Sequence, residues 1–214
     1  MESKKQRRIQ YNQKCILDAA KELFRKNGVI GTTVDEIASS ADCSKATVYV
    51  YFKNKDDIYY HIVLECMKEL CERVKFCFSD TNDYEKAYYS LCDILARFES
   101  KYPEYFEFVT GNISFEPEII EELPVLKSIF DMGEELNKLL CAFLGMAKRN
   151  GFIRANVNPF QATFVLWSSI CGWILFCSGK QNYMNNSLNL PREALLRKGF
   201  SMILQMVRNE SYQD

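Results

Sequence analysis

The chain has 214 residues, of which 48% are hydrophobic, 14% aromatic and 26% charged, and its formal net charge at pH 7 is −1. This composition excludes a disordered chain, and the length is sufficient to bury a core without disulfides or metals. Nine glycines and five prolines are few for this length, which favours long helices over many short strands joined by turns.

Charge is divided unevenly along the chain. Residues 1–55 carry eleven Lys or Arg and six Asp or Glu, whereas residues 56–214 carry sixteen and twenty-two. A basic N-terminal segment on an acidic remainder suggests that the N-terminal segment meets a polyanion. The nine cysteines form no CxxC pair, and no apolar stretch follows the basic N-terminus, so we expect reduced thiols in a cytoplasmic protein.

Helical periodicity runs through nearly the whole chain, so the sequence predicts an all-α fold. Thr33 and Glu36 form a capping box before a short second helix, and Ser44 caps a third helix. Asn54 and Asp57 form a second capping box before a long fourth helix. The helices expected from these signals cover about 9–27, 34–41, 45–51, 55–78, 83–101, 103–111, 117–122, 124–150, 159–179 and 191–210.

The second and third helices, joined by a tight turn, form a helix-turn-helix pattern over residues 33–52. Val48 and Phe52 lie four residues apart and can pack inward. That packing turns outward a face that fits the major groove of DNA and consists of Lys45, Ala46, Tyr49 and Val50. Groups suited to phosphate oxygens flank this face at Thr33, Ser44, Thr47, Tyr51 and Lys55.

Three motifs follow one another in this region: AAKELFRKNG at 19–28, TTVDEIA at 32–38 and SKATVYVYFKNKDDI at 44–58. With them, residues 9–70 resemble the DNA-binding domain of the TetR family of regulators. Asp42 and Cys43 replace the Gly-Val usual in the family's turn, and Ala46 stands where glycine is common, so we expect slight strain in the turn.

The resemblance implies a TetR-type helix-turn-helix domain at 9–70 and a helical-bundle body at 71–214 for dimerisation and ligand binding. It also implies contacts to DNA. In the family, the positions that face the major groove match Lys45, Ala46, Tyr49 and Val50. The positions near the phosphate backbone match Thr33, Thr47, Tyr51 and Lys55.

The last two long helices, 159–179 and 191–210, are expected to pair as a hairpin, and two hairpins would form a four-helix dimer interface. Two stripes are predicted to make this interface: Phe160, Phe164, Trp167, Cys171 and Ile174 on the first helix, and Leu196, Phe200, Ile203 and Val207 on the second. Gly172 and Gly179 would allow close approach of helices. Residues 155–179 carry no charge and are long enough to span a bilayer, but a subunit interface also needs such a helix.

Aromatic residues between the fourth helix and those starting near 83, 103 and 124 suggest an apolar cavity for a hydrophobic or amphipathic effector. These residues are Phe98, Tyr102, Tyr105, Phe106, Phe108, Phe115, Phe130 and Phe143. The ligand pocket that we predict consists of Phe98, Tyr102, Phe106, Phe130, Phe143 and Trp167. Aromatics at helical spacing also commonly fill a core, so the alternative is simple packing.

No P-loop, dinucleotide motif or Ser-His-Asp set occurs, so we expect no enzyme and no cofactor. His61 and Glu65 are spaced for a metal pair, but no second histidine or CxxC completes a site, so we expect no metal. We expect a ligand-responsive repressor that binds a palindromic operator in double-stranded DNA as a homodimer. Two alternatives stay open: an architectural or adaptor protein without an inducer, and a regulator anchored in a membrane by residues 159–179.

Overall fold

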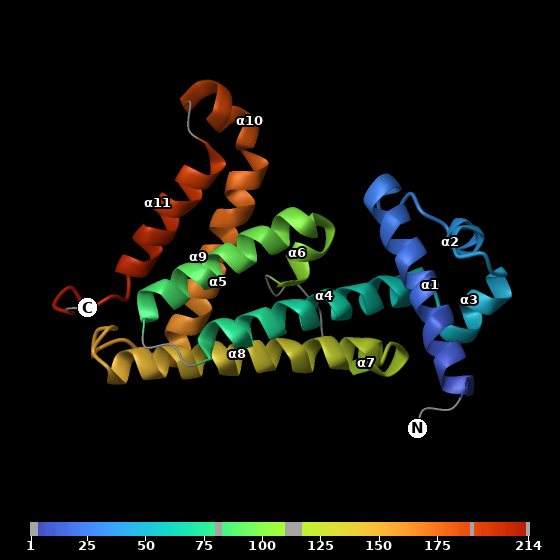
Figure 1. Cartoon of the computed structure of the whole chain (residues 1–214), viewed down its shortest axis with the longest axis horizontal. Coiled ribbons are helices and arrows are strands. Elements are labelled where there is room, and N and C mark those ends of the chain that lie inside the picture. The colour runs from blue at the N-terminus through green and yellow to red at the C-terminus, as the bar shows by residue number, and fades with distance from the viewer. Residues whose placement is uncertain (1–3, 80–82, 110–116, 189–190, 213–214) are drawn as a thin grey trace. The chain divides into compact units, whose positions relative to one another are not determined.

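The computed structural model describes residues 4–79, 83–109, 117–188 and 191–212, and within these ranges it contains helices and no strand (Figure 1). The prediction of an all-α fold is confirmed. In chain order the elements are α1 (Lys4–Asn27), α2 (Val34–Ser40), α3 (Lys45–Tyr51), α4 (Lys55–Phe78), α5 (Tyr84–Lys101), α6 (Pro103–Val109), α7 (Pro117–Glu122), α8 (Val125–Arg149), α9 (Pro159–Gly179), α10 (Gln181–Tyr183), a π-helical stretch η1 (Met184–Leu188) and α11 (Arg192–Gln205).

Two predicted helix boundaries differ from the structure. The first helix begins at Lys4 rather than near residue 9, because the basic and glutamine residues before Ile9 are good helix formers. The last helix ends at Gln205 rather than near 210. There the chain leaves the helix to bond with the segment after α8: Arg154 N–H donates to the Val207 carbonyl at 3.0 Å, and Asn209 N–H donates to the Phe152 carbonyl at 2.8 Å.

The chain divides into two compact units, each of which is described by itself. The first consists of the described parts of Met1–Cys66 and Ser114–Phe130, and the second of the described parts of Met67–Ile113 and Asp131–Asp214. The division therefore falls inside α4, four residues before the predicted domain boundary at 70/71, and a later segment around α7 joins the first unit.

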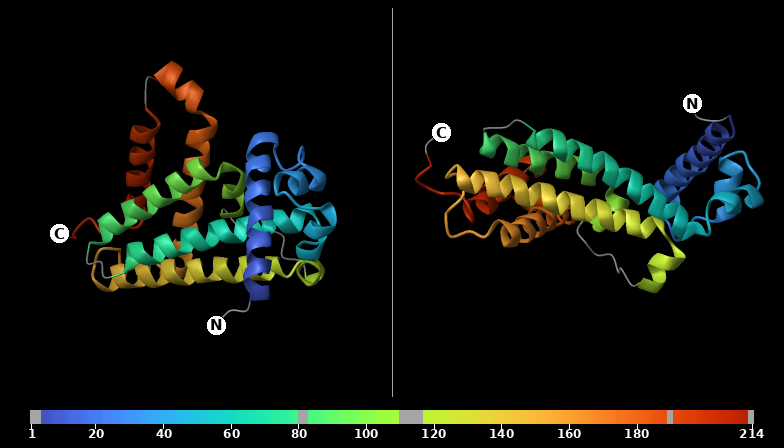
Figure 2. Two further views of the ribbon diagram at one scale, coloured as in Figure 1. Left: turned by 45° about the vertical axis from the view of Figure 1, so that its right-hand side comes forward. Right: turned by 90° about the horizontal axis from the view of Figure 1, so that it is seen from below.

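The first unit has a core where α1, α2 and α3 meet the start of α4. Phe24, Ile37, Phe52 and Ile58 are all buried there. The ammonium of Lys21 pairs with the Glu65 carboxylate at 2.6 Å, which ties α1 to α4. Helices α2 and α3 lie next to each other in both views of Figure 2, and α2 also packs against α1.

In the second unit α9 and α11 run side by side, and α5 packs against both (Figures 1 and 2). The Tyr88 hydroxyl donates to the Phe200 carbonyl at 2.8 Å, and the Arg192 guanidinium pairs with the Glu99 carboxylate at 2.7 Å. The α9–α11 pair approaches closely at Gly199. A β-carbon on that residue would overlap Nε1 and Cε2 of the Trp173 indole and lie 2.6 Å from its Cδ1.

The two stripes predicted to form the dimer interface are largely wrong, because most of them are buried inside the protomer. Cys171 and Ile174 of α9 are buried, and so are all four residues of the α11 stripe, Leu196, Phe200, Ile203 and Val207. Since α9 is apolar around its whole circumference, one face packs within the chain and another remains exposed. The exposed apolar residues of this hairpin are Phe160, Phe164, Val165, Leu175, Phe176, Met202 and Met206.

The glycines of α9 do not lie at the close helix contact within the protomer. Gly172 and Gly179 have no atom within 4 Å of an added β-carbon, and both are exposed. Within the described part of the chain, α9 is also the one helix whose length and apolar composition would let it cross a membrane, with 39% of its most apolar window buried. Seven of its residues are packed inside the second unit.

Candidate nucleic-acid interface

The helix-turn-helix is defined by two helix caps, both of which were predicted. The Thr33 hydroxyl accepts from Glu36 N–H at 3.2 Å, and the Glu36 carboxylate accepts from Thr33 N–H at 2.7 Å. The backbone bond from Thr33, followed by its hydroxyl bond, holds the pKa of the Glu36 carboxyl below its usual value. The Ser44 hydroxyl accepts from Thr47 N–H at 3.0 Å, which fixes the start of α3.

The second predicted capping box is formed with a shifted partner. Asn54 caps α4 by accepting from Asp57 N–H at 2.8 Å. The Asp57 carboxylate, however, accepts from the N–H of Lys53 at 2.9 Å rather than from that of Asn54. The box therefore closes one residue earlier than predicted and fixes the peptide that joins α3 to α4.

The turn between α2 and α3 is strained at Asp42. This residue has φ of 52°, and within the described chain it is the one residue other than glycine with a positive φ. The left-handed region costs an L-residue about 1–2 kcal/mol, although Asp tolerates it better than most. The strain expected from the missing glycine is therefore located at Asp42.

Replacing Asp42 with glycine should stabilise the protein by about 0.5–1 kcal/mol, because glycine reaches the left-handed region without steric cost. Thermal unfolding of the Asp42→Gly and Asp42→Asn variants would measure this. Asn removes the charge and keeps the β-carbon. An equal gain in both variants would assign the effect to charge and contradict the backbone explanation.

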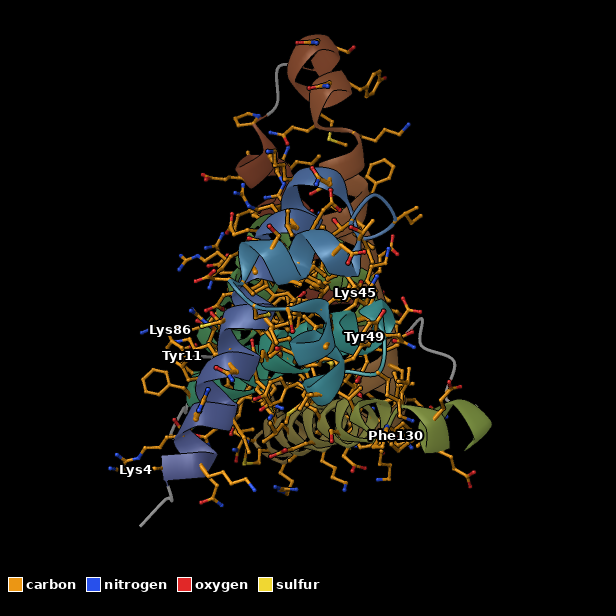
Figure 3. All side chains as sticks on the ribbon, turned by 90° about the vertical axis from the view of Figure 1, so that its right-hand side faces the viewer. Lys4, Tyr11, Lys45, Tyr49, Lys86 and Phe130 are labelled. Carbon is orange, nitrogen blue, oxygen red and sulfur yellow. The ribbon has the colours of Figure 1, made fainter. Side chains whose placement is uncertain are left out.

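The face predicted to meet the major groove is exposed on α3. Lys45, Ala46, Tyr49 and Val50 all lie at the surface, with Tyr49 50% and Val50 75% exposed, whereas Val48 is buried. Figure 3 shows Lys45 and Tyr49 on the side of α3 turned toward the viewer. Large apolar side chains at the surface of a short capped helix indicate a surface that contacts something else.

Lys45 has a weak partner within the protein. Its ammonium pairs with the Asp35 carboxylate of α2 at 2.8 Å, and the two side chains are 49% and 66% exposed. This bond raises the pKa of the Lys45 ammonium, which is therefore charged at neutral pH. Exposed pairs contribute little to stability, so Lys45 can exchange Asp35 for a DNA group at low cost.

The hydroxyls predicted to contact phosphate all have hydrogen-bond partners within the first unit. The hydroxyl of Thr33 donates to Glu36 at 2.8 Å, and those of Ser44 and Thr47 bond to each other at 2.8 Å. The Tyr51 hydroxyl accepts from the Asn12 amide of α1 at 3.0 Å. Asn12 was not predicted to belong to the site, and no local sequence pattern links two residues so far apart.

Lys55 is used inside the first unit. Its ammonium donates to the carbonyls of Val29 and Thr32 at 2.6 and 2.8 Å, and reaches that of Ile30 at 3.3 Å. Because an ammonium has three donors, these bonds occupy its capacity. Lys55 thus fastens the α1–α2 loop to α4, and a phosphate contact would require it to release a carbonyl.

The aromatics of the predicted ligand pocket lie in separate places. Phe98 and Tyr102 line a cavity of about 200 Å³, together with charged residues of α4 and α5. Phe143 and Trp167 line an apolar void of about 20 Å³ between α5, α8 and α9. Phe106 is fully buried, and Phe130 is exposed in the first unit.

Phe115 lies outside the described residues. The apolar void that Phe143 and Trp167 share is far smaller than the 300–1,000 Å³ of a typical ligand pocket.

Within the described residues, no group of three or more His, Cys, Asp or Glu side chains is placed to hold a metal ion. His61 lies 3.6 Å from the Asp57 carboxylate and packs edge-on against Phe52.

Comparison with known proteins identifies the N-terminal region. Residues 16–62, which contain the helix-turn-helix, match the model of the bacterial regulatory proteins of the tetR family. Residues 16–62 therefore form a DNA-binding domain of the tetR family. The chain is a DNA-binding transcription regulator and not an enzyme, as the sequence predicted. Members of this family bind DNA and are dimeric.

Two named regulators are similar over a large part of the chain. The fatty acid metabolism regulator protein of Bacillus subtilis is 28% identical over 142 residues, or 66% of each chain, just under two thirds of its length. The biofilm operon icaADBC negative transcriptional regulator IcaR of Staphylococcus aureus is 27% identical over 169 residues, covering 78% of this chain and 85% of the relative.

Solved structures share the whole fold. SmeT, the repressor of a Stenotrophomonas maltophilia multidrug efflux pump, matches with a TM-score of 0.67 at 18% identity, covering 93% of this chain and 91% of its own. The fatty acid degradation regulator FadR of Bacillus halodurans matches with a TM-score of 0.67 at 17% identity, covering 90% and 94%. At these identities the likeness establishes the fold alone.

Proposed function

We propose that this TetR-family regulator is a ligand-responsive repressor that binds a palindromic operator as a homodimer in the cytoplasm. Residues 9–70 would read the DNA, and residues 71–214 would dimerise and receive the ligand. One observation carries the proposal most directly. The exposed face of α3 combines a cation, a small residue and two apolar side chains, at Lys45, Ala46, Tyr49 and Val50.

Each of these residues suits a different part of the major groove. Ala46 permits close approach of the helix, Lys45 donates to guanine edges or to phosphate, and Tyr49 or Val50 meets a thymine methyl group. Phosphate contacts would come from the hydroxyls of Thr33, Ser44, Thr47 and Tyr51, each of which has further bonding capacity beyond its local partner, and from Lys55 after release of a carbonyl.

Substitution Tyr49→Ala tests the proposed groove face. It should weaken operator binding by about 1–3 kcal/mol, because it removes contact with base edges, and should leave thermal stability unchanged since Tyr49 is half exposed. The matched control is Tyr11→Ala on α1. Tyr11 is 69% exposed and projects sideways in Figure 3, away from the face that carries Tyr49. Electrophoretic mobility shifts or fluorescence anisotropy would report both, and undiminished binding by Tyr49→Ala would refute the assignment.

The dimer would form through α9 and α11, on the face that the protomer leaves exposed. Along α9 this face includes Phe164, Val165, Ser168, Gly172 and Phe176, which recur at helical spacing. Met202 and Met206 continue it on α11. A second copy would cover these side chains, and the two-fold axis would present two α3 helices to half-sites about 34–36 Å apart.

The effector would be hydrophobic or amphipathic, received in the body of the protein. Two relatives are named as regulators of fatty acid metabolism or degradation, and SmeT has a structure described as a triclosan complex, so small apolar molecules are the first to test. The void of about 20 Å³ near Phe143 and Trp167 would have to widen to admit one. Candidate ligands should quench the Trp167 and Trp173 fluorescence and release the operator. DNA binding that no ligand alters would favour the architectural alternative.

A further inference from the structure

A second and larger hollow lies in the second unit, between α5 and the start of α11. Its volume is about 590 Å³, which is within the range of small-molecule sites. The charged side chains on its walls are Arg97, Lys101, Arg192, Arg197, Asp93 and Glu193. Four of these six side chains are cations, and none of the residues predicted to bind an effector lines the hollow.

Arg192 is held in place mainly by residues that do not line the hollow. Its guanidinium donates to the buried Glu99 carboxylate at 2.7 Å, to the Ser178 hydroxyl at 3.0 Å and to the Ser100 hydroxyl at 3.2 Å. The Glu99 side chain is 9% exposed and does not line the hollow. Arg192 is thus oriented by a carboxylate that a ligand in the hollow would not meet.

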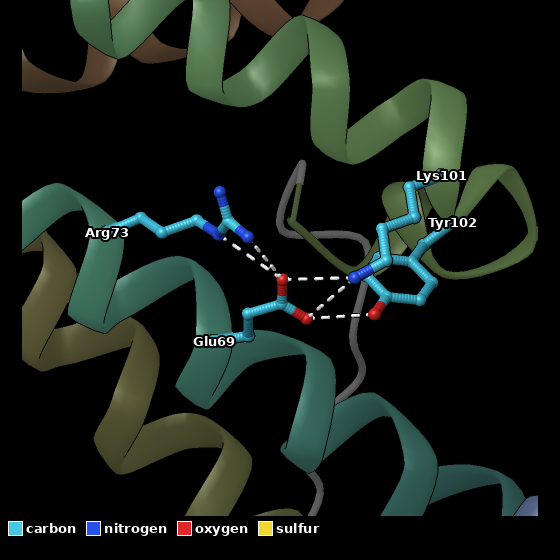
Figure 4. Close-up of polar contacts among 4 residues, drawn as sticks. All are labelled: Glu69, Arg73, Lys101 and Tyr102. Carbon is cyan, nitrogen blue, oxygen red and sulfur yellow. Dashed lines mark hydrogen bonds and ion pairs between the residues drawn. The ribbon is translucent and has the colours of Figure 1, made fainter.

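Lys101 is oriented in the same way. Its ammonium pairs with the Glu69 carboxylate of α4, which also accepts from Arg73 and from the Tyr102 hydroxyl (Figure 4). Glu69 does not line the larger hollow either. Arg197 is held by Asp93 at 3.0 Å and lies over the Tyr89 ring. Arg192 is therefore fixed before any ligand arrives, whereas the side chains of Lys101 and Arg197 are 56% and 55% exposed and are held more weakly.

Arg97 supplies the uncompensated charge. It is exposed, and within the described part of the chain it has no hydrogen-bond or ion-pair partner. It lies one helical turn before Lys101 on α5, and both residues line the larger hollow as well as the neighbouring cavity of about 200 Å³. A free guanidinium between three oriented cations is suited to close on an anion, because its forked donors match phosphate oxygens.

We propose that this hollow binds a small molecule that carries a phosphate group. A phosphate ester has a charge of about −1.5 to −2 at neutral pH and three acceptor oxygens, so it can accept from the forked donors of Arg97 and still face the other cations, whereas a single carboxylate has one charge and two oxygens. The Arg97 guanidinium would close on the phosphate, and Lys101, Arg192 and Arg197 would surround it. The site is separate from the apolar void and does not depend on the proposed repressor function.

Inorganic phosphate is the probe, used with the full-length protein in isothermal titration calorimetry without DNA. We expect saturable binding of one phosphate per chain, weakened roughly tenfold by Arg97→Gln, since a charge-assisted hydrogen bond contributes about 1.5 kcal/mol or more. The matched control is Lys86→Gln, which removes the same charge from an exposed position of α5 outside the hollow and should leave the affinity unchanged.

Three outcomes would overturn the proposal. Equal affinity of wild type and Arg97→Gln would place the anion elsewhere. Loss of binding in Lys45→Gln would assign it to the α3 face, which is built to meet phosphates. Tighter binding of malonate than of inorganic phosphate would assign the site to dicarboxylates, which bring a similar charge on two separated groups.

Discussion

A single methyl group at position 199 should destabilise the protein by about 3 kcal/mol, the upper end for overpacking of a core. The β-carbon of Gly199→Ala would occupy the space of the Trp173 indole, which is a rigid ring system rather than the flexible end of a side chain. Trp173 cannot simply withdraw, because it also stacks on Phe176 at a ring distance of 5.7 Å. We expect the melting temperature to fall by about 6–12 °C in differential scanning calorimetry.

The control is Gly133→Ala in α8, where an added β-carbon meets nothing within 4 Å. That change should raise stability by about 0.5–1 kcal/mol, because alanine is the better helix former. The double variant Gly199→Ala with Trp173→Leu should recover part of the loss, since the shorter side chain vacates the contact. A Gly199→Ala protein as stable as wild type would show that α9 and α11 do not approach closely at this residue.

A negative charge at Ser168 should convert the proposed dimer to monomers. Ser168 is polar and exposed in the middle of the apolar face of α9, so Ser168→Glu costs the isolated protomer little. At a two-fold interface the two carboxylates would be desolvated close to each other. Light scattering should then give one chain mass, 25.0 kDa, in place of twice that value. Operator affinity should fall roughly a hundredfold or more, because each DNA-binding domain would bind its half-site without the second copy of the chain.

Ser128→Glu on α8 is the matched control, because Ser128 is an exposed serine that belongs to the first unit and to neither helix of the proposed interface. It should leave both the mass and the operator affinity unchanged. If Ser168→Glu stays dimeric, the dimer forms through another surface. If wild type is monomeric at the concentrations of the binding assay, the proposed interface is too weak to hold two DNA-binding domains on one operator.

The features predicted correctly from the sequence are those determined by neighbours in the chain. The capping box of Thr33 and Glu36 is made by residues three apart, and the helices α6, α7 and α9 begin at Pro103, Pro117 and Pro159. The exposed side of α3 follows from the same local rule, because buried Val48 fixes the rotation of a seven-residue helix.

The features that the sequence did not predict depend on tertiary contacts. Helix α9 is apolar on every side, so periodicity cannot distinguish the face that packs on α11 from the exposed one, and the predicted stripe included the buried Cys171 and Ile174. The bonds of Lys55 to three carbonyls more than twenty residues away have no local signature. Aromatics such as Phe106 and Phe130 have the same helical spacing whether they fill a core, line a cavity or face solvent.

The contact between Trp173 and Gly199 also provides a natural spectroscopic label. The indole N–H is buried and, among the described residues, has no hydrogen-bond partner, so its proton should exchange slowly with solvent and give a resolved resonance. The α-protons of Gly199 lie close enough to the indole for its ring current to displace their chemical shifts. These signals arise from one pair of helices, so they would report the spacing of α9 and α11 during titrations with ligand or DNA, without any added probe.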